Sequence, residues 1–503
     1  MKRSHILIIL LVFLIVITFN FNKYIPSNYN TLIFLLADII SVIIAVSILL
    51  GNKKMESKIA WTMFVLFVPI IGFLFYMILG IEYNRFSKFD RKIEFDKDID
   101  KLTAKQMDDI GIIINKLGNK KDIVDLIYKF NKSPVSLNNK TEVLTNGDVK
   151  FKRLFEELRN AKSFINIEYF IIKEGKIFDE LKQILIEKAK EGIEIRILYD
   201  DFGCLDLPNK VLKEMQCYGI KTSCFNKINF KLFRPSINYR NHRKIVIIDD
   251  KVAFIGGLNI GDEYAHLDKY YGFWRDTHLL ISGSAVRDLN MIFVKDWYHT
   301  TNELLIEKKY LTDYKIENEK SAIQIVSDGP DSDLGIMRGT FFKMINRATK
   351  RIWITTPYLI LDNELISALK VAALSGIDVR IIVPGIPDKG KKVIYKATEA
   401  YFSELLEYGV KIYKYTDRFI HSKILIIDDD VASIGTVNFD YRSFDLHFEV
   451  TAILYCDPNI AKLVADYEQD LTDSKEILWR EWKNRKPYQK MIESLVRVFS
   501  PLL

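Results

Sequence analysis

The chain has 503 residues, of which 49% are hydrophobic and 27% are charged, and its formal net charge is +7. This hydrophobic content excludes a disordered chain, and the length suffices for two or three ordinary domains. The four cysteines form no C-x-x-C pair, and the seven histidines form no H-E-x-x-H motif, so neither a disulfide framework nor a metal site or other cofactor is indicated. The mild positive charge fits a protein that acts on an acidic lipid or on nucleic acid.

Residues 1–85 are predicted to form a membrane anchor. Three apolar stretches, 6–19, 32–50 and 60–79, follow one another, and a helix needs ~20 residues to cross ~30 Å of hydrocarbon. The second and third stretches are long enough. The first resembles the core of a secretory signal, but no alanine precedes Ala37, so a cleavage site is absent and we expect an uncleaved anchor. The prediction is a multi-pass protein of the cell membrane.

The number of membrane spans stays open between two and three. Basic residues flank all three stretches, and three full spans cannot place every basic group on the cytoplasmic side. The first stretch, or the third with its internal Pro69, is therefore expected not to cross. Asp38 in the second stretch is interpreted as a polar contact between helices. The side of the membrane on which the rest of the chain lies also stays open.

Two similar halves, 140–312 and 313–503, follow a polar segment that we interpret as a linker with helical pieces, 86–139. Each half shows an apolar strand, an amphipathic helix and a second strand rich in β-branched residues. These elements are expected at 165–172, 177–191 and 192–200 in the first half, and at 351–360, 363–375 and 376–384 in the second. Strands that alternate with helices predict an α/β fold with a mixed, partly parallel sheet flanked by helices.

One line of sequence occurs in both halves. HRKIVIIDDKVAFIGGLN starts at His242 and HSKILIIDDDVASIGTVN starts at His421, and 12 of the 18 residues are identical. Each copy is predicted to form a hairpin with its turn at the paired aspartates. Since residues i and i+2 of a strand share a face, His242 and Lys244 point the same way, and the returning strand brings Asn259 beside them. The second copy repeats this arrangement with His421, Lys423 and Asn438.

Two such copies facing each other would surround one point with two histidines, two lysines and two asparagines. Lysines and amide N–H groups suit the oxygens of a phosphate. One histidine can attack phosphorus, and a second histidine, with an ordinary pKa of ~6.5, can donate or accept a proton near neutral pH. The repeated line therefore predicts chemistry on a phosphodiester, at a site that needs both halves and in which lysines rather than a metal ion neutralise the charge.

The pattern H-x-K-x(4)-D-x(6)-G-x-x-N, present twice, resembles that of the phospholipase D superfamily. Further segments resemble bacterial cardiolipin synthases, and the resemblance covers essentially the whole chain. These segments are WTMFVLFVPIIGFLFYMILG at Trp61, GLNIGDEY at Gly257, WRDTH at Trp274, GTVNFDYRSF at Gly435 and SPLL at Ser500. The chain departs from the family pattern in its additional first apolar stretch and in His447, where the family more often has asparagine.

The resemblance implies two tandem phospholipase D-like domains that face each other, preceded by N-terminal transmembrane helices. It implies that His242 is the nucleophile and that His421 acts first as general acid and then as general base, although the reverse assignment stays open. The phosphate oxygens would be held by Lys244, Lys423, Asn259 and Asn438.

Four carboxylates belong to the expected site. Asp249 and Asp428 are part of the family signature and are included in the catalytic set, although their position in a turn favours turn hydrogen bonding over direct chemistry. Asp276 and Glu449 follow the histidines of their own halves, and the resemblance implies that each half supplies one carboxylate to hold an imidazole in the useful tautomer. The glycines of the two copies, Gly256 and Gly435, are expected to allow a tight turn.

The resulting hypothesis is a membrane-bound synthase for which phosphatidylglycerol is both donor and acceptor, although phosphatidylethanolamine or a glycolipid could replace the acceptor. One alternative is a phospholipase D that uses water and releases phosphatidic acid. A nuclease is disfavoured, and no nucleic-acid partner is expected, because the chain lacks a concentrated basic stripe with interleaved aromatic residues. A non-catalytic lipid-binding membrane protein is the other alternative. The oligomeric state stays open.

Overall fold

The computed structural model describes residues 27–502, except 52–53, 81–84, 103–114, 116, 228–237, 313, 317–320, 333 and 417. The first apolar stretch, 6–19, lies outside the described residues.

The two halves share one continuous 16-stranded sheet, in which β1 (Val135–Thr145) of the first half and β10 (Ser321–Asp328) of the second pair antiparallel at the centre. Outwards from β1 lie β9 (Thr277–Gly283), β7 (Val252–Gly256), β6 (Lys244–Ile248), β2 (Phe164–Tyr169), β3 (Glu194–Asp200) and β4 (Lys221–Phe225). Outwards from β10 lie β19 (His447–Tyr455), β17 (Val431–Gly435), β16 (Ile424–Ile427), β11 (Arg351–Thr355), β13 (Asp378–Pro384), β14 (Lys411–Tyr415) and β20 (Ser474–Glu476). The order in one half repeats that in the other, as expected for a duplicated domain.

The predicted α/β pattern is confirmed in each half. The strands β2, β3 and β4 run parallel, as do β11, β13 and β14, whereas the remaining neighbours along the path pair antiparallel. Parallel neighbours require crossover helices, and these are α9 (Lys176–Lys190), α10 (Asn209–Cys217), α13 (Asn363–Leu374), α14 (Lys392–Glu399) and α15 (Phe402–Glu407). The sheet is therefore mixed and partly parallel.

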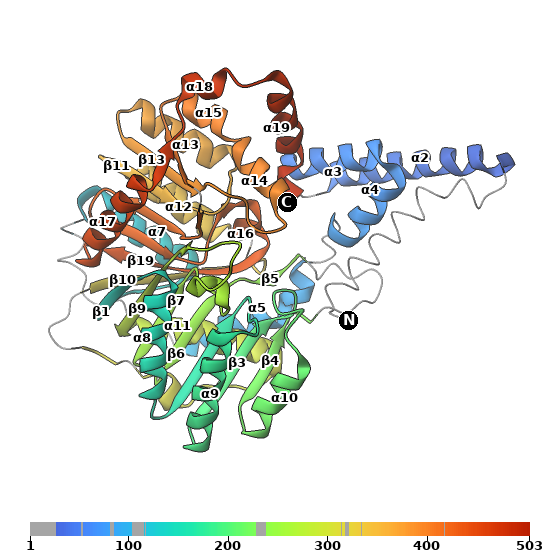
Figure 1. Cartoon of the computed structure of the whole chain (residues 1–503). Coiled ribbons are helices and arrows are strands. Elements are labelled where there is room, and N and C mark those ends of the chain that lie inside the picture. The colour runs from blue at the N-terminus through green and yellow to red at the C-terminus, as the bar shows by residue number, and fades with distance from the viewer. Residues whose placement is uncertain are drawn as a thin grey trace.

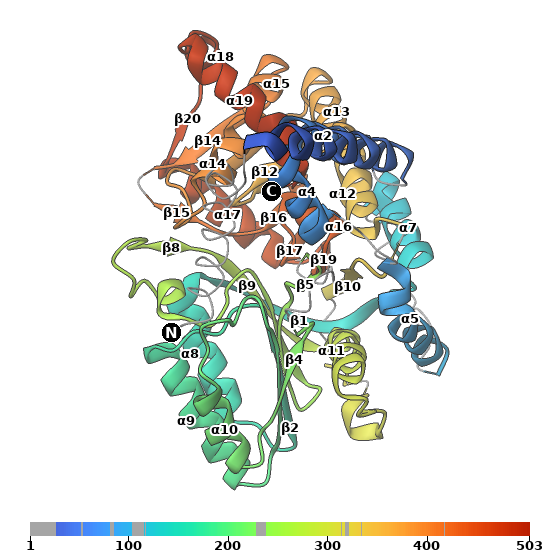
Figure 2. The same cartoon turned by 90° about the vertical axis from the view of Figure 1, so that its right-hand side faces the viewer.

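Both faces of the sheet are covered, which explains why its strands are apolar without alternation. In β6, Ile245 and Ile247 pack into a core shared by both halves, whereas Val246 and Ile248 face the helices of the first half. The shared core lies under α11 (Ala285–Thr301) and α17 (Asn459–Thr472). The opposite face carries α8 (Asn146–Arg159) with α9 and α10 in the first half, and α12 (Ile336–Asn346) with α13 in the second. Figures 1 and 2 show the two halves one above the other.

The predicted linker is in part an integral element of the fold. Its helix α7 (Lys121–Asn131) buries Ile123, Val124 and Ile127 in the core of the second half. The strand β1 begins at Val135, before the predicted domain boundary at residue 140. An earlier helix, α5 (Arg85–Leu102), buries Phe89 in the shared core. The segment therefore ties the N-terminal helices to both halves.

The N-terminal helices lie beside the second half, next to the C-terminal helix α19 (Pro487–Phe499) (Figure 1). The second apolar stretch forms α2 (Ser27–Leu50). The third is divided into α3 (Met55–Phe67) and α4 (Pro69–Phe75), because proline provides no N–H for a continuous helix. Asp38 is exposed on α2, so the expected polar contact between helices is not found in the described part of the chain. Within that part, no helix combines the length and the hydropathy that a membrane crossing demands.

Candidate active site

Each copy of the repeated line forms the predicted hairpin. The strands β6 and β7 form the first, and β16 and β17 form the second. Asp249 and Asp428 adopt positive φ angles of 56° and 53° at the turns, in the left-handed region that aspartate tolerates. The motif histidine and lysine precede or begin the first strand of each hairpin, and all four side chains are buried: His242, Lys244, His421 and Lys423.

Two short strand pairs bring each motif histidine to the opposite half. The strand β5 (Arg240–Asn241) pairs with the start of β19, and β15 (Phe419–Ile420) pairs with β8 (Trp274–Arg275). The backbone N–H of His242 consequently donates to the carbonyl of Phe448 at 2.9 Å, and the N–H of His421 donates to the carbonyl of Arg275 at 2.7 Å. In both halves the accepting residue directly precedes a buried carboxylate.

The histidine–carboxylate pairs are crossed between the halves. His242 Nδ1 lies 2.9 Å from Glu449 Oε1, and His421 Nδ1 lies 2.8 Å from Asp276 Oδ2. Each half supplies one carboxylate to an imidazole, as expected from the resemblance, and the structure adds that the imidazole belongs to the other half. The strand pairs β5–β19 and β15–β8 explain the exchange, because they place the residue after Phe448, and that after Arg275, against the other half's histidine.

The two lysines occupy equivalent positions. The ammonium group of Lys244 donates to the carbonyl of His242 at 2.6 Å, and that of Lys423 donates to the carbonyl of His421 at 2.5 Å. Burial lowers the pKa of Lys244 well below its ordinary value and lowers that of Lys423 to about 8, against the opposing carboxylates of Asp276 and Glu449. An anion between the lysines would favour their charged forms.

Both imidazoles are favoured in the neutral form at neutral pH. Burial, reinforced by Lys244 and Lys423, holds the pKa of His242 well below its ordinary value. Burial and then Lys423 lower the pKa of His421 to about 4, whereas the Asp276 carboxylate opposes this shift. His421 therefore has a carboxylate that favours its protonated form, while the largest influences on His242 all favour its neutral form.

The two asparagines differ. Asn438 lines a cavity, and its buried Oδ1 has no hydrogen-bond partner within the described structure. The side chain of Asn259 is already engaged, because its Oδ1 accepts from the N–H of Ile171 at 3.1 Å and its Nδ2 donates to the hydroxyl of Tyr264 at 3.1 Å. The second copy thus offers the freer amide.

The structure does not bring the signature aspartates into this site. The Asp249 carboxylate, at the far end of β6 from His242, accepts from three consecutive backbone N–H groups, of Lys162, Ser163 and Phe164, at 2.7–3.0 Å. Asp428 does the same for Thr349, Lys350 and Arg351 at 2.8–3.2 Å. Both carboxylates thus accept from the chain that enters the adjacent strand, which is distant in the sequence, and not from their own turn as expected. The catalytic grouping finds no geometric support.

The glycines of the repeated line have a different reason from the tight turn expected. A Cβ at Gly256 would lie 2.6 Å from the carbonyl oxygen of Thr277, and a Cβ at Gly435 would lie 2.4 Å from that of Val450. Both glycines end a strand whose neighbour contains, or directly follows, a histidine-orienting carboxylate: Glu449 lies in β19, and Asp276 precedes β9. They allow β7 and β17 to approach β9 and β19 closely.

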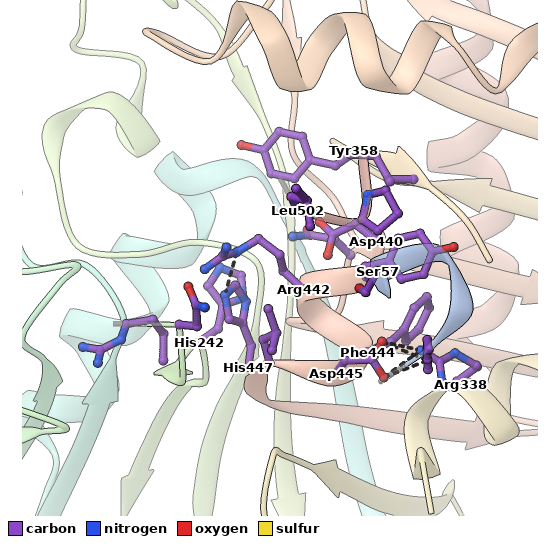
Figure 3. Close-up of a pocket in the computed structure, with 18 of the residues that line it drawn as sticks. Ser57, His242, Arg338, Tyr358, Asp440, Arg442, Phe444, Asp445, His447 and Leu502 are labelled. Carbon is purple, nitrogen blue, oxygen red and sulfur yellow. Dashed lines mark hydrogen bonds and ion pairs between the residues drawn. The ribbon is translucent and has the colours of Figure 1, made fainter. Parts of the chain in front are cut away.

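A cavity of about 570 Å³ leads away from His242. It extends past Asn438 and Arg442 to Trp61 on α3 and to Leu502 at the C-terminus (Figure 3). The site therefore opens towards the N-terminal helices.

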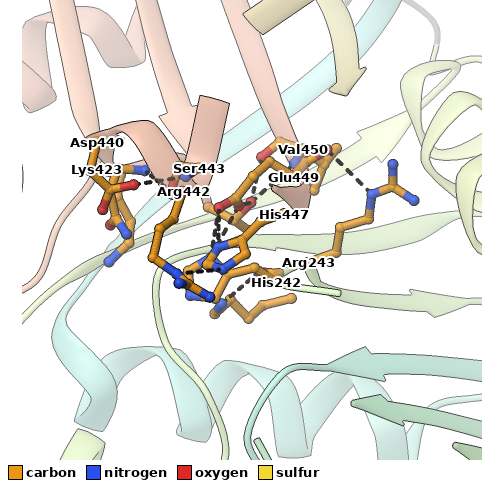
Figure 4. A network of polar contacts seen from close by, with 12 residues as sticks. His242, Arg243, Lys423, Asp440, Arg442, Ser443, His447, Glu449 and Val450 are labelled. Carbon is orange, nitrogen blue, oxygen red and sulfur yellow. Dashed lines mark hydrogen bonds and ion pairs between the residues drawn. The ribbon is translucent and has the colours of Figure 1, made fainter. Parts of the chain in front are cut away.

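Two residues of this cavity were not assigned a role from the sequence. The ring of His447 lies 5.3 Å from that of His242, and the Nε–H of Arg442 donates to His447 Nε2 at 3.4 Å (Figure 4). Thr436 donates to Glu449 and holds it from the other side. His447 was noticeable as a departure from the family pattern, whereas nothing in the sequence separates Arg442 from other basic residues near the motif.

Three potential metal ligands meet at this point. Nitrogen or oxygen atoms of His242, His447 and Glu449 all lie within 4.8 Å of one another. Two of these residues already form the crossed pair, and His447 lies with Nδ1 3.7 Å from the same carboxylate while its Nε2 accepts from Arg442. A positive charge at this edge disfavours a divalent cation.

The chain is similar to known proteins over most of its length. A family model described as the phospholipase D-like domain of cardiolipin synthase matches residues 154–297 and 341–472. A cardiolipin synthase of Geobacillus kaustophilus is 42% identical over 466 residues, and one of Halalkalibacterium halodurans is 41% identical over 471 residues, each match covering 92% of both chains. The chain belongs to the cardiolipin synthase family. Its phospholipase D-like segments contain both copies of the repeated line, with the crossed carboxylates Asp276 and Glu449.

Other comparisons extend this family assignment. A model described as a phospholipase D-nuclease N-terminal segment matches residues 39–80, which include the C-terminal half of α2 and all of α3 and α4. The crystal structure of a phosphatidylserine synthase from Haemophilus influenzae matches with a TM-score of 0.59 and 16% identity over 76% of this chain and 100% of that one. This likeness shows that the fold is shared with another structure.

Proposed function

We propose that this member of the cardiolipin synthase family transfers a phosphatidyl group from one phosphatidylglycerol to another, producing cardiolipin and glycerol. The observation that carries the proposal is the pair of buried histidines, each held by a carboxylate of the opposite half and each beside a lysine. This arrangement provides one nucleophile and one proton-transfer group at a single phosphate site.

In the first step, His242 attacks the phosphorus of the donor. Glu449 at Nδ1 leaves Nε2 as the atom that bonds to phosphorus, and the lowered pKa of His242 keeps that nitrogen unprotonated. The P–O bond to glycerol breaks, and His421 gives its proton to the departing oxygen. The anionic donor raises the proton affinity of His421, which the Asp276 carboxylate supports.

In the second step, the neutral His421 accepts the proton of an acceptor hydroxyl while that oxygen attacks phosphorus. The P–N bond to His242 breaks, and the phosphodiester of the product forms. Lys244 and Lys423 hold the phosphate oxygens in both steps, and the charge on the phosphate stabilises their ammonium forms. Asn438 supplies an additional amide to this phosphate. Asn259 stabilises the hairpin through its bonds to Ile171 and Tyr264.

Membrane attachment belongs to the same proposal. Large apolar side chains are exposed along α2 and on one face of α19, which contacts α3 through Phe64 and Phe499. On α2 these are Leu35, Leu36, Ile39, Ile40, Val42, Ile43, Val46, Leu49 and Leu50, and on α19 they are Tyr488, Met491, Ile492 and Leu495. We infer that this surface lies in the lipid bilayer, at the end of the cavity where phospholipids enter. The multi-pass anchor at the cell membrane stays a prediction.

Alkaline carbonate extraction tests this attachment. The native protein should stay with the membrane pellet, and the double variant Met491→Glu/Leu495→Glu should bind phosphatidylglycerol vesicles more weakly if α19 contributes to the surface. Complete release of the native protein by carbonate would contradict an anchored protein.

Product analysis tests the reaction. The purified protein is incubated with phosphatidylglycerol vesicles in the presence of EDTA, and the lipids are identified by mass spectrometry. Cardiolipin and glycerol in equal amounts are expected. Phosphatidic acid as the main lipid product would mean that water is the acceptor and that the protein is a phospholipase D.

A further inference from the structure

Five basic side chains line the cavity that opens from His242. Four of them are ion-paired: Lys54 with Asp445 at 2.9 Å, Arg240 with Asp200 at 3.4 Å, Arg338 with Asp445 at 2.8 Å, and Lys391 with Asp388 at 2.6 Å. The fifth, Arg442, has no carboxylate within ion-pair distance in the part of the chain that the structure describes. Among the described residues, its guanidinium is therefore the cavity cation that forms no direct ion pair.

The hydrogen bonds of Arg442 also give its guanidinium no carboxylate partner among the described residues. Its Nε–H donates to His447 Nε2, and neither of its terminal nitrogens has a hydrogen-bond partner among the described residues. The nearby Asp440 carboxylate is used to cap the helix α16 (Tyr441–Asp445), where it accepts from the N–H of Ser443 at 2.7 Å. Desolvation, with a contribution from the nearby Arg240, lowers the pKa of Arg442, whereas the Asp440 carboxylate opposes this shift. Arg442 is half-buried and its terminal nitrogens are not among the buried polar atoms that lack a partner, so they are available to an anion that enters the cavity.

The position of Arg442 relative to the reacting phosphate is defined by one imidazole ring. His447 contacts Arg442 on one side and lies 5.3 Å, ring to ring, from His242 on the other (Figures 3 and 4). The donor phosphate at His242 already has two lysines, Lys244 and Lys423. The ring of His447 therefore separates Arg442 from the reaction centre, and Arg442 lines the cavity rather than the buried phosphate site.

Cardiolipin synthesis requires a second phosphate at such a position. The attacking hydroxyl of an acceptor phosphatidylglycerol is separated from that lipid's own phosphodiester by the three carbons of glycerol. While the hydroxyl meets the phosphorus on His242, the second phosphodiester lies one glycerol away and keeps its negative charge. Neither water nor free glycerol would bring a second phosphate.

We propose that Arg442 binds the phosphodiester of the acceptor phospholipid and so selects a phosphate-bearing alcohol over water. The inference rests on the proposed function and deepens it. The acceptor oxygen forms the new P–O bond, the P–N bond to His242 breaks, and the proton passes to His421. The second phosphodiester is only held, through the two terminal guanidinium nitrogens, and remains chemically unchanged. His447 accepts at Nε2 and so carries its proton on Nδ1, which orients the guanidinium.

The variant Arg442→Gln tests this subsite with two reactions of the full-length protein in phosphatidylglycerol vesicles. The exchange of lipid headgroup with labelled glycerol uses the donor phosphate and a neutral acceptor, and should stay within about twofold of the native rate. Cardiolipin formation uses the second phosphate and should fall by about tenfold or more, since one charge-assisted contact is lost. The ratio of phosphatidic acid to cardiolipin should rise accordingly. Arg442→Lys should give an intermediate ratio.

A matched control is Lys391→Gln, which removes a lining cation that is already paired with Asp388. It should leave the ratio of the two products unchanged. The proposal is overturned if glycerol exchange and cardiolipin formation fall together in Arg442→Gln, because Arg442 would then act on the donor or on folding. It is also overturned if neither changes. A native protein that exchanges glycerol but forms no cardiolipin would instead contradict the proposed function.

Discussion

At the scale of single residues, the site consists of side chains whose ordinary charge states are disfavoured by burial. The sequence identifies the histidines and lysines, because the repeated line places them on one face of a strand. The resemblance also identifies the carboxylates Asp276 and Glu449, but the sequence does not show that each one lies against the histidine of the opposite half. That contact depends on β5 and β15, two strands of two residues each, which carry no recognisable pattern.

The buried Lys423 should make stability depend on pH. Its pKa is about 8 in the folded chain, against an ordinary value of 10.5. The unfolded chain therefore binds more protons between pH 8 and 10.5, so the contribution of this group makes the free energy of unfolding rise with pH by up to about 3 kcal/mol across that window. Lys423→Met should be the more stable protein below pH 8 and should lose this rise. Urea unfolding at pH 7.5 and pH 10 measures the effect.

The exposed Lys350 provides the control for this prediction, because its side chain is 74% exposed. Lys350→Met should follow the native pH dependence. If Lys423→Met has the same slope as the native protein, the desolvation of Lys423 is not the cause.

The crossed pairing predicts a specific kinetic defect. Glu449→Gln keeps the shape of the side chain but removes the charge beside His242 Nδ1, so the release of glycerol in a first turnover should slow by about 100-fold. Rapid-quench measurement with headgroup-labelled phosphatidylglycerol gives this rate. Glu476→Gln, at an exposed position of the edge strand β20, should keep the native rate. A native rate in Glu449→Gln would contradict the pairing.

At the scale of elements, the repeated hairpin is where sequence reasoning is most successful. The alternation of faces and the turn residues predict β6–β7 and β16–β17, and the structure has both. The roles of the polar residues that both hairpins share are harder to predict from the sequence. Asp249 and Asp428 belong to the same repeated motif as the histidines and lysines. Their carboxylates, however, accept hydrogen bonds from the backbone at the beginning of a neighbouring strand of the sheet. Spacing alone does not distinguish a residue at the site from one at the far end of the same strand.

Removing one of these aspartates should therefore affect stability and leave chemistry intact. Asp249→Ala deprives three consecutive backbone N–H groups of their acceptor, so the free energy of unfolding should fall by about 1–3 kcal/mol. The folded fraction should keep a near-native rate of cardiolipin formation. Asp429→Ala, at an exposed turn position, should change stability by less than about 1 kcal/mol. A folded but inactive Asp249→Ala protein would mean that Asp249 takes part in catalysis.

At the scale of the whole molecule, the two halves are one body. The duplication, the parallel strand sets and the order of helices follow from the repeated pattern. The continuous sheet does not, because the antiparallel pairing of β1 with β10 joins equivalent strands of the two halves that are distant in the chain, and a repeat within each half does not specify a pairing between the halves. The packing of α7 into the core of the second half also joins segments that are distant in the chain, so the repeated pattern does not predict it either. The seam between the halves is what allows each half to complete the other's histidine.

This architecture predicts that the site is complete within one chain. A mixture of the inactive variants His242→Ala and His421→Ala should show no restored cardiolipin synthesis, since every chain lacks one histidine of its only site. The assay uses the two proteins reconstituted together in the same vesicles. Activity well above that of either variant alone would mean that histidines from two chains meet.

The central claim is that His242 carries the phosphatidyl group. The most direct measurement is mass spectrometry of peptides from protein quenched during turnover of phosphatidylglycerol, under conditions that preserve phosphohistidine. A phosphatidyl adduct is expected on the peptide that contains His242, and none is expected in His242→Ala. An adduct on the peptide that contains His421, or one that persists in His242→Ala, would contradict this claim.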